Sequence, residues 1–298
     1  MNWPNWQVLI RGELLMTFNI VLGLAIGDAI MRLGLADRLM KRFMPHLERI
    51  GIGPVLATAM TVGIGSSKAG AALLAKALDE GRITREGAVW GTVSLSFPAY
   101  LRRWPSTLVL CVSMTGAVGA IFAATLLLRS LGRFLLVALK ARGSEQADFA
   151  VAETQRKPRG ALSWYKSLLR TLPVAWTFYA AALTLMPMLE AYLKENLGGS
   201  ILPITGWGVA SAALASISAS LAMARGALAA GELSGAQAVF ALLLGNGLGY
   251  VTRALRQNAG YFFGIFPVGV SKSILIRNVA TMLPFTLASI LISLLFIL

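Results

Sequence analysis

Small and hydroxylated residues interrupt an apolar segment in the first third of the chain. The run GIGSSKAG brings Gly63, Gly65, Ser66, Ser67 and Lys68 together in otherwise apolar surroundings. Glycines weaken a helix, and an opened helix exposes N–H and C=O groups that need polar partners. The N-terminus of a half-helix there would attract an anion, and Lys68 adds a full positive charge. The alternative is close helix packing through small residues, which needs no ligand.

A second hydroxyl-rich run, ASISAS, lies in the last third of the chain. It carries Ser216, Ser218 and Ser220, but it lacks the glycines and the lysine of the first run. We expect the two runs to form two unequal parts of one substrate site.

Two arginines follow apolar segments at matching places. Arg103 and Arg253 each stand three residues after a tyrosine, and Asn246 precedes the second pair. Guanidinium groups can clamp a phosphate or a carboxylate, and a buried amide needs hydrogen-bond partners. We therefore count Arg103, Arg253 and Asn246 as candidate solute ligands. The alternative for the arginines is an extended side chain that reaches the lipid headgroups.

A carboxylate lies late in the first apolar segment, at Asp28. A charge at membrane depth costs roughly 2.5–3.5 kcal/mol on insertion scales, which makes it a functional candidate. Asp28 could bind a coupling proton or sodium ion, or it could pair with an arginine.

The composition of the chain indicates the class of protein to which these residues belong. Of 298 residues, 56% are hydrophobic and 13% are charged, whereas a soluble domain is about a quarter charged. This excludes disorder, a coiled coil and an ordinary cytosolic enzyme, and it predicts an all-α polytopic membrane protein. The net charge of +14 then favours the lipid bilayer over nucleic acid as the partner.

Residues of catalytic or metal-binding type are sparse. His46 is the single histidine and Cys111 the single cysteine. There is no zinc motif, phosphate-binding loop or nucleophile–base pair. We therefore expect neither an enzyme nor a resident cofactor or metal ion.

The elements divide into two halves. A polar segment at 140–160 separates residues 1–139 from residues 161–298 and is too polar to cross a bilayer. We expect interruptions within the apolar segments near positions 63–70, at Gly116 and Gly119, and at Pro267 and Gly269.

The second half repeats the first. At an offset of about 150 residues, Gly81 matches Gly231, and Tyr100 and Arg103 match Tyr250 and Arg253. Alanine-rich composition would not readily produce these matches in one register, so we infer an internal duplication.

Loop charges predict the topology. The basic linker at 140–160 should lie in the cytoplasm, whereas the acidic loop at 190–200 should face outward, opposite to its basic counterpart in the first half. The halves are then inverted. Five spans in each half, about ten in total, fit this pattern, and so do three spans plus a re-entrant hairpin. We expect Arg129 and Arg133 to lie near a helix end and face the cytoplasm.

The run GIGSSKAGAALLAKALDEGRIT, followed by SFPAYLRRW, resembles the Gate, or nucleoside-recognition, domain family. Nucleoside transporters and the membrane part of the ferrous-iron transporter share this domain. The resemblance is clearest over residues 53–128 and 202–283. It implies a helical membrane fold with two Gate-like repeats and a role in solute translocation.

These observations predict a transporter or permease in the bacterial inner membrane. Alternating access of the inverted repeats would move a small polar solute, anionic or nucleoside-like. The alternatives are a membrane scaffold that transports nothing and a lipid translocase. A homo-oligomer is compatible with the sequence.

Overall fold

The computed structural model describes residues 52–141 and 202–297, together with positions 10, 14, 17, 18, 21, 173 and 176. The two long ranges are helical and contain no β-strand, which confirms the all-α class. Their helices are α3 (Pro54–Gly65), α4 (Ser67–Asp79), α5 (Arg85–Ser94), α6 (Ser96–Thr115), α7 (Ala117–Lys140), α9 (Ile204–Ala215), α10 (Ile217–Ala229), α11 (Gly235–Ile265) and α12 (Val268–Leu295).

Helices α3 and α4 form a hairpin of two short helices. Pro54 stands at the start of α3, where its missing N–H leaves no hydrogen bond unmade. The helix ends at Ser66, whose backbone is extended (φ −157°, ψ 115°). The Ser66 hydroxyl accepts from the N–H of Ala69 at 3.3 Å and so caps α4. The interruption expected at positions 63–70 is confirmed.

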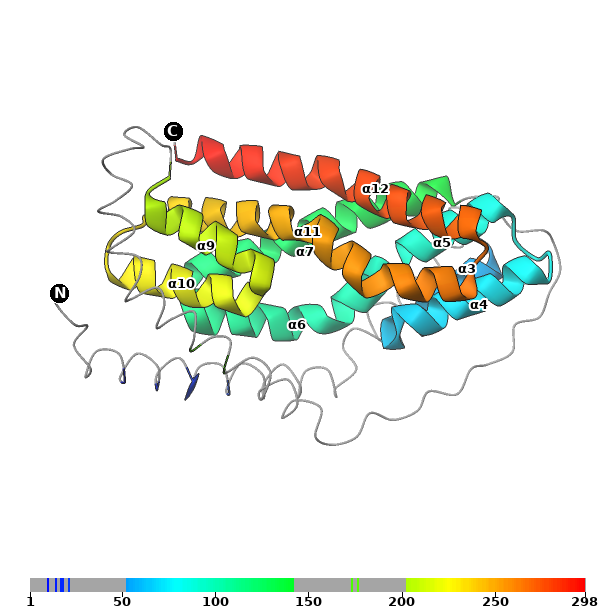
Figure 1. Ribbon diagram of the computed structural model, residues 1–298, viewed down its shortest axis with the longest axis horizontal. Coiled ribbons are helices and arrows are strands. Elements are labelled where there is room, and N and C mark those ends of the chain that lie inside the picture. The colour runs from blue at the N-terminus through cyan, green and yellow to red at the C-terminus, as the bar shows by residue number, and fades with distance from the viewer. Residues whose placement is uncertain are drawn as a thin grey trace.

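The second half contains the same hairpin at an offset of 150 residues. Helices α9 and α10 meet at Ser216, which is again extended and again caps the second helix, through Ala219. The following turns also match, because Gly81 and Gly231 adopt φ values of 70° and 72° that favour glycine. Figure 1 shows the two hairpins at opposite ends of the molecule, each with its central break toward the middle.

The next segment differs between the halves. In the first half α5 ends at Ser94 and α6 begins at Ser96, whereas α11 runs without a break through the matching positions. Pro98 explains the difference, because proline has no N–H to donate to the carbonyl of Ser94 one turn earlier. The matching position holds Leu248, which keeps that hydrogen bond available.

Each half of the described chain closes with a long apolar helix. Helix α7 begins after Gly116, which adopts φ 60°, and α12 begins after Pro267. Both expected interruptions are confirmed.

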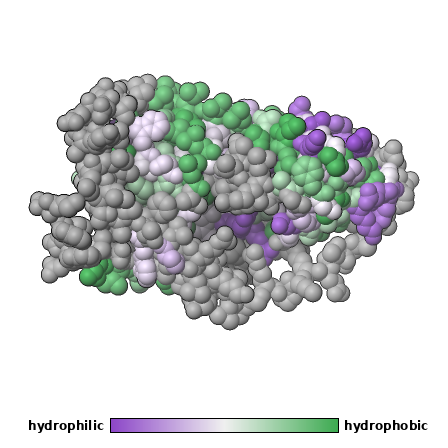
Figure 2. Space-filling model, viewed as in Figure 1, coloured by the Kyte–Doolittle hydropathy of each residue, from purple (hydrophilic) through white to green (hydrophobic). Residues whose placement is uncertain are grey.

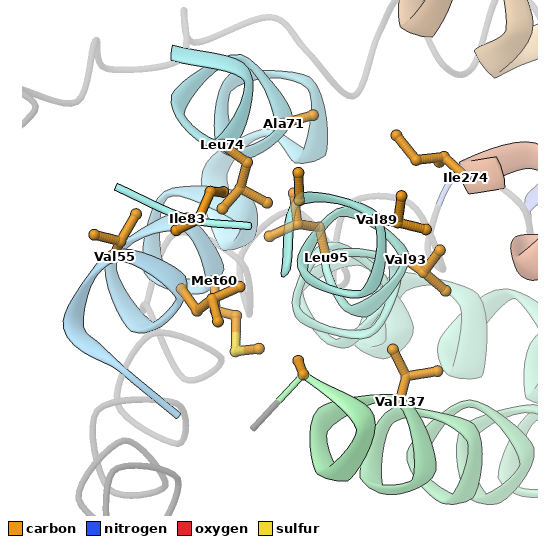
Figure 3. Close-up of a cluster of buried hydrophobic side chains, with 14 of the residues drawn as sticks. Val55, Met60, Ala71, Leu74, Ile83, Val89, Val93, Leu95, Val137 and Ile274 are labelled. Atoms are coloured by element: carbon orange, nitrogen blue, oxygen red, sulfur yellow. The ribbon is translucent and has the colours of Figure 1, made fainter. Parts of the chain in front are cut away.

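Buried apolar side chains form two clusters, one around each hairpin. The first gathers α3, α4 and α5 against α7 and α12, and Figure 3 shows Leu74 of α4 near Leu95, the residue between α5 and α6, and Val137 of α7 near Val93 of α5. The second gathers α9, α10 and α11 against α6 and α7 around Phe122 and Leu221. Helix α7 contributes to both clusters, so it joins the two hairpins.

Within the described ranges, α7 and α12 are long and apolar enough to cross a membrane. Their length and composition suggest membrane association. The hairpin helices have 12 or 13 residues each, fewer than the roughly 20 that a span requires.

Helix α12 carries polar residues on its buried side and apolar residues on its exposed side. Its exposed residues include Ile276, Leu283, Leu287, Leu291 and Leu295, at 50–72%. Its buried polar residues are Ser271, Asn278, Thr286, Ser289 and Ser293. Figure 2 shows the apolar surface over this part of the molecule and hydrophilic residues gathered at the end where α4 joins α5.

Two glycines of α11 offer a test of the packing. A Cβ at Gly245 would lie 2.3 Å from the backbone oxygen of Ala210, whereas a Cβ at Gly264 would meet nothing within 4 Å. We expect Gly245→Ala to lower the free energy of unfolding by about 1–3 kcal/mol through overpacking. Gly264→Ala should raise it by roughly 0.5–1 kcal/mol through helix propensity. Thermal unfolding of the purified variants measures both, and equal melting temperatures would contradict this packing of α9 on α11.

Candidate functional site

The first predicted group of site residues lies at the α3–α4 break. Ser66, Ser67 and Lys68 are exposed there. The Lys68 ammonium lies 5.2 Å from the ring centroid of Tyr261, whose hydroxyl donates to the Lys68 carbonyl at 2.6 Å. These contacts attach the break to α11.

The glycines of this group have a packing role. A Cβ at Gly63 would lie 3.1 Å from the side chain of Leu95, and one at the neighbouring Gly70 would lie 2.7 Å from the backbone oxygen of Ala59. Gly65 is the last residue of α3. The small residues therefore let α3, α4 and Leu95 approach closely.

The serines of the second group stabilise the α9–α10 hairpin. Ser216 and Ser218 share a hydrogen bond of 3.1 Å, and Ser220 donates to the carbonyl of Val209 at 2.7 Å. This last bond joins the two helices of the hairpin across the break. It satisfies a buried hydroxyl that would otherwise be costly.

Of the two predicted arginines, the structure describes the side chain of Arg103. Arg103 is exposed, and its Nε donates to the carbonyl of Ala99 one turn earlier. The side chain of Arg253 and the whole of Asp28 lie outside the described residues.

Asn246 leads to a site that sequence reasoning missed. Its side-chain oxygen accepts a hydrogen bond from Arg129 of α7, across the boundary between the halves. Arg129 and Arg133 are only 6% and 5% exposed. The expectation that both face the cytoplasm at a helix end is therefore wrong, because they stand in the middle of the 24-residue helix α7 and point into the bundle.

We call Arg129, Arg133, Asn246 and Asn278 the arginine–amide cluster, and Arg133 makes most of its hydrogen bonds. Its Nε donates to Thr281 at 3.0 Å, and its Nη2 donates to the side-chain oxygen of Asn278. Its Nη1 donates to Ser96 at 3.2 Å and to the hydroxyl of Tyr250 at 3.4 Å. The guanidinium is thus held by neutral groups of α6, α11 and α12, which belong to both halves.

Neutral partners hold a guanidinium in place without cancelling its charge. The four acidic residues of the described ranges, Asp79, Glu80, Glu86 and Glu232, are all exposed. The hydrogen-bond partners found for Arg133 include no carboxylate. The middle of the bundle therefore carries a buried cationic group surrounded by hydroxyls and amides, which is the donor chemistry of an anion site.

A second charged cluster lies at the hydrophilic end of the molecule. Arg277 of α12 donates to both carboxylate oxygens of Glu86 and lies 4.6 Å over the ring of Trp90, while Lys140 lies 5.5 Å over that ring. The hydrogen bond from Arg277 lowers the pKa of Glu86 below its ordinary value. These contacts connect α5, α7 and α12, but Glu86 is exposed and Arg277 is paired with its carboxylate.

Metal-ligand chemistry is not gathered anywhere in the described residues. No group of three His, Cys, Asp or Glu side chains that could hold an ion occurs among them. Cys111 is buried as a free thiol in the second apolar cluster.

No protein-family model matches this sequence, and no solved structure matches it. The chain is similar to the uncharacterized protein MJ0871 of Methanocaldococcus jannaschii, with 22% identity over 280 residues. The match covers 86% of this chain and 84% of the relative, so the similarity extends over both halves.

The amide of Asn278 should be essential to the cluster. Asn278→Leu removes the oxygen that accepts from Arg133 and leaves a charged donor buried without it. We expect a loss of about 1.5–3 kcal/mol in the free energy of unfolding.

Ser289→Ala is the matched control on the same helix. Ser289 is also buried, but its hydroxyl donates to the carbonyl of Thr286 within α12. Its removal should change stability by less than about 0.5 kcal/mol. Equilibrium unfolding compares the two variants, and equal losses would show that Arg133 does not depend on Asn278.

Proposed function

We propose that this protein is a membrane transporter or permease for a small polar, anionic solute, which binds at the arginine–amide cluster between the two halves. The observation that carries the proposal is the buried Arg133 guanidinium, held by neutral side chains from both halves. A charge at such depth is costly, and in a membrane protein it marks a solute pathway by default.

The face pattern of α12 supports a membrane location. In a soluble protein the apolar face of a helix is buried and the polar face meets water. On α12 the leucines and isoleucines include exposed residues along its length, and the buried residues include serines, a threonine and an asparagine beside Val270, Ile274, Leu275 and Met282. An apolar exposed face fits lipid, and buried hydroxyls that bond within the protein fit a bundle without bulk water.

The ends of the molecule support an orientation. Lys76 lies in the last turn of α4, Arg82 and Arg85 follow in the turn to α5 and at its start, and Lys140, the last residue of α7, lies 5.5 Å over the ring of Trp90 in α5. The positive-inside rule puts such an end in the cytoplasm. We therefore place the protein in the cytoplasmic membrane, with this end and the linker inside the cell.

The two hairpins support a translocation mechanism. Their helices are too short to span a bilayer, and they reach toward the middle of the molecule from opposite ends. This favours three spans plus a re-entrant hairpin in each half over five full spans. Inverted repeats with broken helices and a site between them are a common construction of secondary transporters. The resemblance to Gate domains implies the same role.

One observation favours a scaffold that transports nothing. The hydrogen bonds of Arg133 join the halves directly, so the cluster could serve only to hold the bundle together. Transport measurements separate the two functions.

Flux into proteoliposomes tests the proposal. With a panel of radiolabelled anions and nucleosides, we expect uptake that exceeds that of empty liposomes for at least one anion. Arg133→Gln should reduce this uptake at least tenfold, because it removes the charge, while Arg133→Lys should retain part of it. Arg225→Gln, a partly buried arginine of α10, is the matched control and should transport normally. Uptake equal to that of empty liposomes across the panel would favour the scaffold.

A further inference from the structure

Arg129, the second buried arginine of α7, restricts the class of solute that the site can bind. Arg129 and Arg133 are four residues apart on one helix, so they share a face, and both are buried. A single guanidinium already satisfies a carboxylate with two parallel hydrogen bonds. A ligand that bridges two guanidiniums needs more than two oxygens. Two negative charges on the ligand would balance the two positive charges of the arginines.

Residues related by the repeat surround the two arginines. At the offset of 150 residues, Ser96 corresponds to Asn246 and Tyr100 corresponds to Tyr250. Ser96 accepts from Arg133, and Asn246 accepts from Arg129. Polar groups from both halves therefore accept hydrogen bonds from the arginine pair at these matching positions.

Tyr100 and Tyr250 occupy matching positions but differ in their hydrogen bonds. The hydroxyl of Tyr250 accepts from Arg133, whereas Tyr100 lies within the electrostatic reach of Arg129. The Tyr100 hydroxyl is buried and has no hydrogen-bond partner among the described residues. A buried phenol in that state is costly unless a ligand accepts from it.

Two hydrogen bonds of Arg133 are long enough that bonds to a ligand could replace them. Its bond from Nη1 to Ser96 is 3.2 Å long, at the upper end of the usual range for N–H···O bonds, and its bond to Tyr250 is 3.4 Å long, beyond that range. Oxygens of a ligand can replace these two acceptors, while Thr281 and Asn278 keep the guanidinium in position.

We propose that Arg129 and Arg133 together bind a doubly charged oxyanion of the phosphate type, with the hydroxyls of Tyr100 and Tyr250 on either side. The inference rests on the proposed function, since it names the solute class of the same site. The phosphate group could belong to a free solute or to a lipid headgroup.

Binding to the purified full-length protein tests this. Isothermal titration with inorganic phosphate, sulfate, succinate and acetate should show phosphate and sulfate binding at least tenfold more tightly than the two carboxylic acids. Arg129→Gln and Arg133→Gln should each weaken phosphate about 10- to 100-fold, as expected for the loss of charge-assisted hydrogen bonds. Arg225→Gln should bind as the unaltered protein does.

Tyr100→Phe keeps the test informative if the arginine variants fail to fold. Because the Tyr100 hydroxyl has no hydrogen-bond partner in the part of the chain that the structure describes, its removal should raise the melting temperature of the free protein. The same change should reduce the rise in melting temperature that phosphate produces. A variant that responds to phosphate like the unaltered protein would overturn the role of Tyr100 and with it this site.

The outcomes separate this inference from the function on which it rests. Anion uptake with no preference for phosphate or sulfate over acetate would overturn the oxyanion class and leave transport standing. Absence of both anion binding and uptake would overturn the transport proposal. Binding of a short-chain phosphatidic acid in competition with phosphate supports the shared chemistry, and the tighter of the two identifies the source.

Discussion

The burial of a permanent positive charge at Arg133 is the constraint on which the rest of the bundle depends. A guanidinium cannot lose its proton at physiological pH, so the fold must solvate it with its own groups. Those groups come from α6, α11 and α12. The helices that supply them must therefore turn polar residues inward, as α12 does with Asn278 and Thr281.

The repeat explains how two halves supply one site. The hairpins α3–α4 and α9–α10 recur at one offset with the same breaks, caps and glycine turns, but Arg129 and Arg133 both lie in α7. Ser96 and Asn246 occupy matching positions and reach different arginines of that one helix. A symmetric framework thus holds an asymmetric charge pair, and α7, which packs into both apolar clusters, connects the two.

Local chemistry made the helix breaks predictable from the sequence. Glycine, serine and proline act within one turn, so the interruptions near Ser66, Gly116 and Pro267 could be located. Asn246 was found because a buried amide needs partners. Arg129 and Arg133 were expected near a helix end, but they lie inside α7 and are buried, because the groups that accept their hydrogen bonds come from helices more than a hundred residues away in the chain. Twelve residues into a 24-residue apolar helix, a charge is itself the signal for a buried site. The contacts of Lys68 with Tyr261 join residues far apart in the chain, which no local pattern records.

Because of Pro98, the first half has a break between α5 and α6 where the second half has the continuous helix α11. The segment that is one continuous helix in α11 is divided at Leu95 in the first half. Ser96, directly after this junction, accepts a hydrogen bond from Arg133. Bending at this junction would move the Ser96 oxygen that accepts from Arg133, whereas α11 is unbroken at the matching positions. The angle between α5 and α6 therefore sets the position of one of the oxygens that surround the buried charge, and only the first of the two matching segments contains such a junction.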